Sequence, residues 1–320
     1  MKRVLLLAAA FVSSVVAVNG WAQKYPTKPM RLISPFAPGG GTDILARGIA
    51  VPVAEAFGQP VVVDNRPGAG GTTGAELVAR AAPDGYTMIM VASTYASTSA
   101  YGKTSFDPID GIQPIILLGT TGLVMAVHPS IPVKSVRELV DHARANPGKL
   151  NYSSVGAGSV PHLGIELFKL ETGTHLVHVP YKGAGPALVA LVGGEVQLTT
   201  ISMVPMLPHM KAGRLRALAI TTPARAALLP DLPTIGESVP GFEVTHWYGV
   251  WGPKGMPKTI VDRWNSEIAR ILNTDEMKMR TRAEGLEAAG GAPQELGALI
   301  RRDVEKWRRV ISQAKIRREG

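Results

Sequence analysis

The residues in this chain whose types and spacing could do chemistry are glycines that follow short apolar runs. Residues 30–33, Met-Arg-Leu-Ile, form a mainly apolar run, which predicts a buried strand. Three glycines, residues 39–41, then precede a helical pattern that Thr42 or Asp43 could cap. Glycines allow several backbone N–H groups to point into one small space, and the dipole of the following helix attracts an anion there. This first loop, residues 35–43, therefore predicts a site for a carboxylate or another small anion.

A second loop of the same kind lies in the other half of the chain. A short strand pattern at 150–155 leads into residues 156–159, Gly-Ala-Gly-Ser, and a helical pattern begins near Pro161 and His162. Two such loops favour a ligand held between two lobes of the protein. Two unrelated tight turns would give the same pattern, and the loops alone do not separate these alternatives.

The sequence does not support several other kinds of site. The first loop lacks the Gly-Lys-Ser/Thr of phosphate loops and the Gly-x-Gly-x-x-Gly spacing of dinucleotide-binding loops. The chain has no Cys, and its seven His show no His-x-x-x-His spacing. An alternative is a hydrolase with Ser159 as nucleophile and His162 as its base. A Ser and a His three residues apart in one helical turn do not usually have the geometry in which an acidic residue orients the His toward the Ser. We expect no enzyme activity, no cofactor and no bound metal.

The composition fits a globular protein and does not indicate nucleic-acid binding. The 320 residues are 45% hydrophobic and 18% charged, which provides for a sizeable core in one large or two ordinary domains. The formal net charge of +9 is concentrated at the ends: residues 301–320 carry eight Lys or Arg against three acids, and Lys2 and Arg3 add two more. No basic stripe with interleaved aromatic residues lies between them, so we expect no nucleic-acid partner.

The order of the patterns predicts an exported α/β protein. Residues 1–22 have a positive start, an apolar stretch and a small-x-small site before Gln23, which is typical of a cleaved signal peptide. The apolar stretch is about 15 residues long, short of the roughly 20 that span a bilayer. Strand and helix patterns then alternate, which indicates mostly parallel sheets with helices on both faces. We place the chain crossings between the lobes near Thr120 and Thr221.

Several motifs resemble those of one known family, and they occur in order along the whole mature chain. They are PFAPGGGTD at 35–43, DNRPGAGG at 64–71, PDGYT at 83–87, GAGSVPHL at 156–163, VPYKG at 179–183 and LPDLPT at 229–234. On these motifs the chain resembles the Bug-type (TctC-like) extracytoplasmic solute receptors of tripartite tricarboxylate transporters.

The resemblance implies a periplasmic, two-lobed α/β binding protein of type II, with a ligand in the cleft between the lobes. Lobe 1 would comprise residues 23–120 and 222–320, and lobe 2 residues 121–221. The ligand would be a small carboxylate (a dicarboxylate, a tricarboxylate, an amino acid or an aromatic acid) held largely by backbone N–H groups. Carried over position by position, the ligand-binding residues would be Phe36, Ala37, Gly39, Gly40, Gly41, Asp43, Ser93, Thr94, Ser153, Ser154, Gly158, Ser159 and His162.

The resemblance also implies a partner. A monomeric receptor of this type delivers its ligand to the membrane permease subunits of a tripartite tricarboxylate-type transporter. A receptor that signals to a membrane sensor kinase would need the same cleft, so the sequence leaves this alternative open.

Three places depart from the family pattern: Pro52 lies inside the first expected helix, and two others bear on the identity of the ligand. The segment 95–101 replaces a more usual His/Asn-Pro pattern, and His246 stands beside Trp247 near the expected rim of the cleft. Tyr95 and His246 could stack on an aromatic acid.

Overall fold

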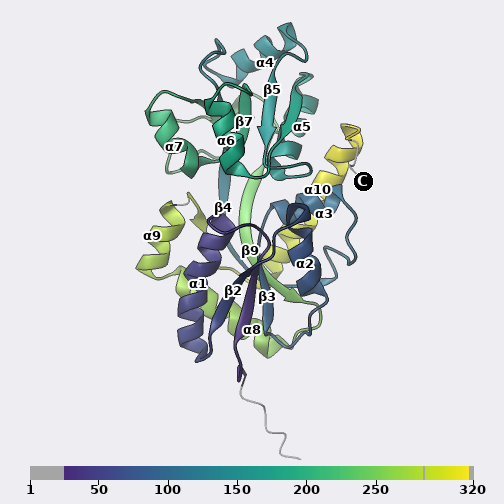
Figure 1. Cartoon of the computed structure of the whole chain (residues 1–320), viewed down its shortest axis with the longest axis vertical. Helices are drawn as coiled ribbons and strands as arrows, with labels where there is room; N and C mark the ends of the chain where they lie inside the picture. The colour runs from purple at the N-terminus through teal and green to yellow at the C-terminus, as the bar shows by residue number, and fades with distance from the viewer. Residues whose placement is uncertain (1–24, 284, 317–320) are drawn as a thin grey trace, which may run out of the picture.

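The computed structural model describes residues 25–283 and 285–316, and its two α/β lobes lie one above the other along the longest axis (Figure 1). The predicted signal peptide, residues 1–22, lies outside the described residues. Both lobes share the strand β4 (Ile112–Val127), which pairs first with β9 (Thr245–Pro253) and then with β7 (Leu198–Ser202). The predicted α/β fold with two lobes is confirmed.

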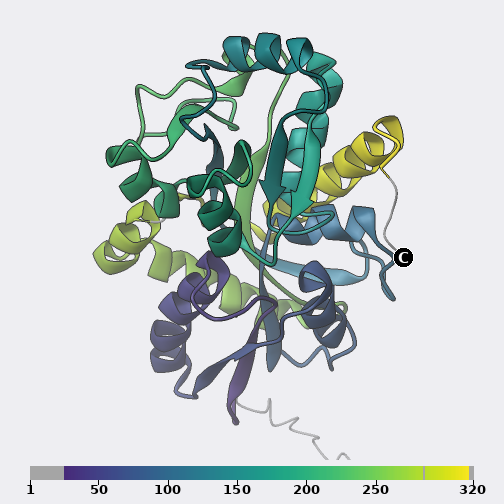
Figure 2. The same ribbon diagram turned by 45° about the horizontal axis from the view of Figure 1, so that its top comes forward.

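Lobe 1 is built on a sheet with the strand order β2-β1-β3-β9-β4, and β10 (Glu287–Ala288) pairs with β4. β1 (Met30–Ser34), β2 (Val61–Asn65) and β3 (Thr87–Ala92) are parallel, while β9 is antiparallel to β3 and β4. Helices cover both faces, so β1 and β3 are apolar on both faces. One face carries α1 (Gly41–Phe57), α8 (Lys258–Leu272) and α9 (Asp275–Ala283) (Figure 1, Figure 2). The other face carries α2 (Thr72–Ala79), α3 (Thr94–Tyr101) and α10 (Pro293–Gln313).

Lobe 2 contains β8 (Arg216–Ile220), the end of β4, β7, β5 (Asn151–Ser154) and β6 (Val177–Pro180) in spatial order. β5 is parallel to β6 and β7, and β4 is antiparallel to β7 and β8. One face packs on α4 (Val136–Ala145) and α5 (Val160–Thr172), and the other on α6 (Ala184–Val192) and α7 (Met203–Lys211). Ser135 begins α4 because its hydroxyl accepts the Glu138 N–H at 3.1 Å.

The strand register brings the ends of several strands to the junction between the lobes. Gly122 of β4 pairs with Thr245, the first residue of β9. β3 is antiparallel to β9 and ends beside its start, where Ser93 N donates to Trp247 O. In lobe 2, β7 ends opposite Leu123, and the parallel strand β5 ends on the same side. The loops after β1, β3 and β5 therefore face the junction, which is where open α/β sheets usually bind ligands.

The segment 222–244 packs against lobe 2, whereas the sequence analysis assigned it to lobe 1. Val244 N donates to Thr221 O at 2.8 Å, which holds the end of the segment beside the end of β8. The ring of Phe242 packs edge-to-face on Phe168 of α5. A short 3-10 turn, η2 (Ile235–Glu237), lies within the segment. The limits of the lobes remain a proposal, and these contacts favour the start of β9 as the return to lobe 1.

The helices cover the sheets with one apolar face each. In α10, Leu296, Ile300, Val304 and Trp307 are buried at a spacing of three and four residues, while Arg301 is exposed. A second 3-10 turn, η1 (Ala69–Gly71), precedes α2. No helix within residues 25–283 or 285–316 is both long and apolar enough to cross a membrane.

Candidate functional site

The first loop is held in shape by the carboxylate of Asp43, which lies in the first turn of α1. One carboxylate oxygen accepts from Gly39 N and from Arg47 Nε, both at 3.0 Å, and the other accepts from Asn65 Nδ2 at 2.9 Å. Burial acts to raise the pKa of Asp43, but these hydrogen bonds hold it below its ordinary value. Asp43 is therefore a charged group that fixes the loop, and its contact with a ligand remains a prediction.

The start of α1 presents backbone N–H groups without partners. The N–H groups of Gly40, Gly41 and Thr42 have no hydrogen-bond acceptor among the described residues. A Cβ added to Gly40 would meet one atom within 4 Å, the Ala37 carbonyl oxygen at 3.9 Å, so open space lies beside it. A Cβ on Gly41 would come within 2.5 Å of the Tyr248 hydroxyl, so glycine is needed there for close packing. Unpaired N–H groups beside open space are suited to an anion.

Phe36 and Ala37 lie just before these glycines. The Phe36 carbonyl accepts from Asn65 Nδ2 at 3.0 Å. The Phe36 ring packs beside Gly71, where an added Cβ would lie 3.2 Å from the ring, and Ala37 is exposed. The ring thus links the first loop to the glycine-rich turn before α2.

Ser93 and His246 form a buried pair where β3 ends and β9 begins. Ser93 Oγ lies 2.5 Å from Nδ1 of His246, and the two residues are 1% and 7% exposed. Burial lowers the pKa of His246 to about 4, so the imidazole is neutral at pH 7. The His246 ring contacts the Tyr248 ring edge-to-face, with 5.0 Å between centroids. Thr94, the next predicted contact, begins α3 and is buried.

The segment 95–101 forms most of α3, and its two tyrosines face different parts of the protein. Tyr95 packs into the core of lobe 1, with its ring 5.4 Å from Trp251 and its hydroxyl donating to Pro108 O at 2.8 Å. These contacts do not support the stacking role suggested for Tyr95. Tyr101 reaches lobe 2, because a Cβ on Gly158 would lie 2.6 Å from its ring. Nothing in the residue pattern of 95–101 predicts this contact between the lobes.

The second loop, unlike the first, uses most of its N–H groups internally. Gly158 N donates to Nδ1 of His162 at 3.0 Å, and Ser159 N donates to Gly156 O at 3.2 Å. Gly156 N donates to Ser154 Oγ at 3.1 Å. The Ser159 hydroxyl donates to Gly156 O at 2.6 Å and caps α5 by accepting from His162 N at 3.4 Å. The two loops are therefore not equivalent, because only the second has nearby Ser and His side chains that satisfy its backbone.

His162 and His178 stack beside the second loop, with ring centroids 3.9 Å apart. Burial and then the charge of Lys169 lower the pKa of His162 to about 4, and burial and then His162 lower that of His178 to about 3. Both rings are neutral at pH 7. Because Nδ1 of His162 accepts the Gly158 N–H, the proton of the neutral ring is on Nε2. The Nε2 of His178 lies 2.7 Å from Ser154 Oγ.

Ser153, in contrast, points into lobe 2. Its Oγ donates to Thr199 Oγ1 at 2.8 Å and to the Ala187 carbonyl at 3.3 Å, and the residue is 0% exposed. Neighbouring strand residues face opposite sides of a sheet, so Ser154 is directed away from Ser153. Ligand contact by Ser153 remains a prediction that these hydrogen bonds do not favour.

The Ser and His residues of the site do not form a catalytic triad in the described chain. The Ser159 hydroxyl bonds to a backbone carbonyl rather than to the ring of His162. Ser93 pairs with His246 and Ser154 with His178, but no carboxylate of the described residues hydrogen-bonds to either ring. Within residues 25–283 and 285–316, no three His, Asp or Glu residues are grouped as a metal site.

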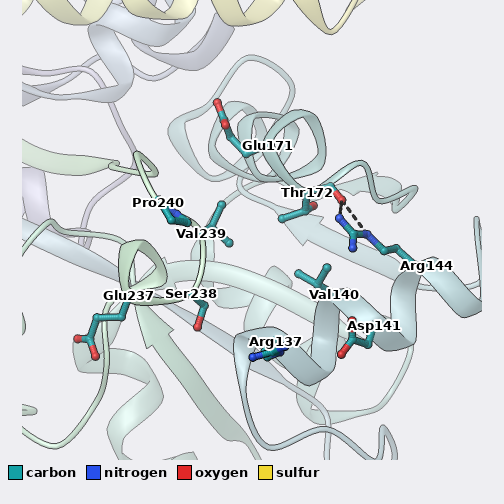
Figure 3. A pocket seen from close by; sticks show the side chains of 10 residues that line it. All are labelled: Arg137, Val140, Asp141, Arg144, Glu171, Thr172, Glu237, Ser238, Val239 and Pro240. Carbon is teal, nitrogen blue, oxygen red and sulfur yellow. Dashed lines mark hydrogen bonds between the residues drawn. The ribbon is translucent and has the colours of Figure 1, made fainter.

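Two pockets lie away from the predicted binding residues. The larger, about 420 Å³, is on lobe 2 between α4, the end of α5 and residues 237–240 (Figure 3). Its wall includes Arg144, whose guanidinium donates to Thr172 O (Figure 3). A smaller pocket of about 150 Å³ lies at the chain crossing, beside Thr121 and Gly122. Neither contains a residue of the first or second loop.

Comparisons with known proteins identify the family. The "Tripartite tricarboxylate transporter family receptor" family matches residues 45–316. Protein BugT of Bordetella pertussis is 33% identical over 318 residues, which cover 98% of each chain.

Two solved structures from relatives contain small acids. The structure "R. palustris Rpa4515 with adipate" is 38% identical, covers 91% of this chain and 98% of its own, and has a TM-score of 0.83. MatC from Rhodopseudomonas palustris with bound malate is 31% identical, covers 90% and 100%, and has a TM-score of 0.81. The structure of periplasmic binding protein BugD also aligns, at 32% identity and a TM-score of 0.81. These likenesses confirm the two-lobed binding-protein fold, and the chain belongs to the tripartite tricarboxylate transporter family receptors, of the Bug type.

Proposed function

We propose that this protein is a periplasmic receptor that binds a small carboxylate between its lobes and delivers it to a tripartite tricarboxylate-type permease. The observation that carries the proposal is the start of α1. There, the N–H groups of Gly40, Gly41 and Thr42 have no acceptor in the described chain, and they lie at the junction of the lobes. Such a helix start supplies partial positive charge without a cationic side chain.

The two lobes would contribute differently to binding. Lobe 1 would hold one carboxylate with the backbone of the first loop, from Phe36 to Asp43. Lobe 2 would close on the ligand with the Nε2–H of His162, because most of the second loop's N–H groups are already used. Ser154 and Ser159 would join it by turning their hydroxyls from the Gly156 carbonyl to the ligand. The adipate and malate in the related structures support a dicarboxylate as the first ligand to test.

The route and the partner of the receptor follow from the same proposal. Residues 1–22 would direct export and be removed, and the mature monomer would carry its ligand to the membrane permease subunits. Closure on the ligand would be a hinge motion at the chain crossings, where β4 and β9 pass between the lobes.

A thermal-shift screen tests the receptor function directly. The mature protein, residues 23–320, would be heated with mono-, di- and tricarboxylates, aromatic acids, amino acids and amides. A ligand at about 100 times its dissociation constant adds roughly 2.7 kcal/mol of stability, which gives a clear shift. Recovery of the same ligand unchanged, by mass spectrometry, distinguishes a receptor from an enzyme.

A variant of Gly40 shows whether the first loop is the site. Gly40→Val fits the backbone, since φ is −83° and the new side chain would enter open space, so the fold should remain intact. The side chain would fill the space for the carboxylate and should abolish the shift. Ala145→Val, at the exposed end of α4, is the matched control and should bind as the wild type does. Equal binding by all three proteins would remove the first loop from the site.

A further inference from the structure

His246 lies where the first loop meets the junction between the lobes. It is the second residue of β9 and pairs with Thr121 at the point where β4 passes from one lobe to the other. His246 and Tyr248 are two residues apart and in ring contact, so they share one face of the sheet. That face is the one covered by α1, because the Tyr248 hydroxyl lies against Gly41. His246 is therefore next to the helix start that carries the proposed function.

The hydrogen bond with Ser93 fixes which nitrogen of His246 carries the proton. Among the described residues, Nδ1 of His246 is the only hydrogen-bond partner of Ser93 Oγ, at 2.5 Å. If Nδ1 were protonated, the hydroxyl proton of buried Ser93 would have no acceptor there. The Ser93 hydroxyl therefore donates to Nδ1, and the neutral ring carries its proton on Nε2.

The other ring nitrogen of His246, Nε2, has no partner in the part of the chain that the structure describes. It makes no hydrogen bond with residues 25–283 or 285–316. The residue is 7% exposed and pairs with Thr121 at the crossing between the lobes, so this N–H is available to a group that enters the junction. Burial accounts for the lowered pKa of this imidazole.

We propose that His246 is a ligand-binding residue that donates its Nε2–H to an oxygen of the bound acid, with Ser93 as the positioning residue that holds the tautomer. The inference rests on the proposed function and adds a side-chain contact to the backbone contacts of α1. A neutral N–H at this position donates to a carboxylate or carbonyl oxygen, whereas a ligand ammonium group there would meet another donor. The site would thus favour acids without an amino group at that end over amino acids.

The experiment combines variants with a direct measurement of the tautomer. The probe is adipate, with malate second, and affinities are measured by calorimetry for the wild type, His246→Phe, His246→Gln and Ser93→Ala. His246→Phe keeps a ring but loses the donor, so its affinity should fall about tenfold or more, while thermal unfolding confirms the fold. His246→Gln keeps an N–H donor and should lose less. Long-range ¹⁵N NMR should show Nε2–H in the wild type and a mixture of tautomers in Ser93→Ala.

The outcomes separate this inference from the proposed function. Wild-type affinity in His246→Phe would overturn the inference while leaving carboxylate binding in place. A wild-type ring with the proton on Nδ1 would also overturn it, whether or not a probe binds. If the wild type binds neither acid, the acid that the thermal-shift panel identifies becomes the probe, and wild-type affinity for it in His246→Phe would overturn the inference. If no acid of the panel binds the wild type, the proposed function fails and the inference fails with it.

Discussion

Mild acid should destabilise this protein through His246, and the size of the effect follows from its burial. The folded pKa is about 4, lowered by burial from an ordinary value near 6.5. Between these two pH values the unfolded chain binds a proton at this residue and the folded chain does not. The stabilising contribution is therefore fully present above pH 6.5 and is lost as the pH falls toward 4.

The magnitude is set by one proton over that window. The free energy of unfolding should fall by about 1.4 kcal/mol per pH unit, or about 2 kcal/mol between pH 7 and pH 5, from His246 alone. His162 and His178 act in the same direction, because burial lowers their pKa values as well. His246→Gln removes one titrating group, so its stability should fall by about 2 kcal/mol less than that of the wild type over the same range.

Urea unfolding followed by tryptophan fluorescence provides the measurement. The wild type and His246→Gln would be compared at pH 7, 6 and 5 in buffers free of carboxylates, since citrate or acetate could bind the site. The difference between the two proteins should grow as the pH falls. Parallel pH profiles would refute the reasoning, because they would mean that His246 titrates in the folded protein as it does in the unfolded chain.

Two glycine positions give further predictions. Gly41→Ala places a Cβ 2.5 Å from the Tyr248 hydroxyl, so it should lower the free energy of unfolding by about 1–3 kcal/mol, measured with urea. Adding Tyr248→Phe to the same chain should restore part of this loss. Wild-type stability in Gly41→Ala would contradict the close packing. Gly158→Ala has a φ of +74° and a Cβ 2.6 Å from the Tyr101 ring, so it should lower both the melting temperature and the affinity for adipate. Adding Tyr101→Ala should relieve the clash but not the backbone strain, and full recovery would show that strain at residue 158 is negligible.

Much of the framework could be predicted from the sequence, because it depends on local patterns. Apolar runs that end in glycine-rich turns specify strands followed by helices, and their alternation specifies the α/β class. The apolar run before residues 39–41 became β1, and the helix expected after it became α1. The place of the first loop at the junction then follows from the parallel strand order.

The differences between the two loops could not be predicted from their glycines. Whether an N–H group is unpaired depends on side chains that fold back on it. In the second loop Ser154 and His162 satisfy the backbone, whereas in the first loop the carboxylate of Asp43 takes the N–H of Gly39 and leaves those of Gly40 and Gly41 unpaired. Which N–H groups stay unpaired is determined by tertiary packing, and the spacing of residues along the sequence does not predict it.

The aromatic contacts between elements could not be predicted from the sequence, in contrast to one ring contact within β9. The eight residues of α3 have no apolar stripe, so nothing in them showed that Tyr95 faces the core and that Tyr101 reaches lobe 2. The alternation in β9, in contrast, places His246 and Tyr248 on one face of the sheet. That signal was sufficient to pair them, although not to place them beside Gly41.

Backbone NMR of the mature protein during titration with adipate tests the central claim most directly. If a carboxylate binds at the start of α1, the amide resonances of Gly40, Gly41 and Thr42 should shift the most and gain protection from hydrogen exchange, with smaller changes at the second loop. Adipate that binds while these three amides stay unchanged, and that instead shifts residues around the pocket between α4 and α5, would contradict the account.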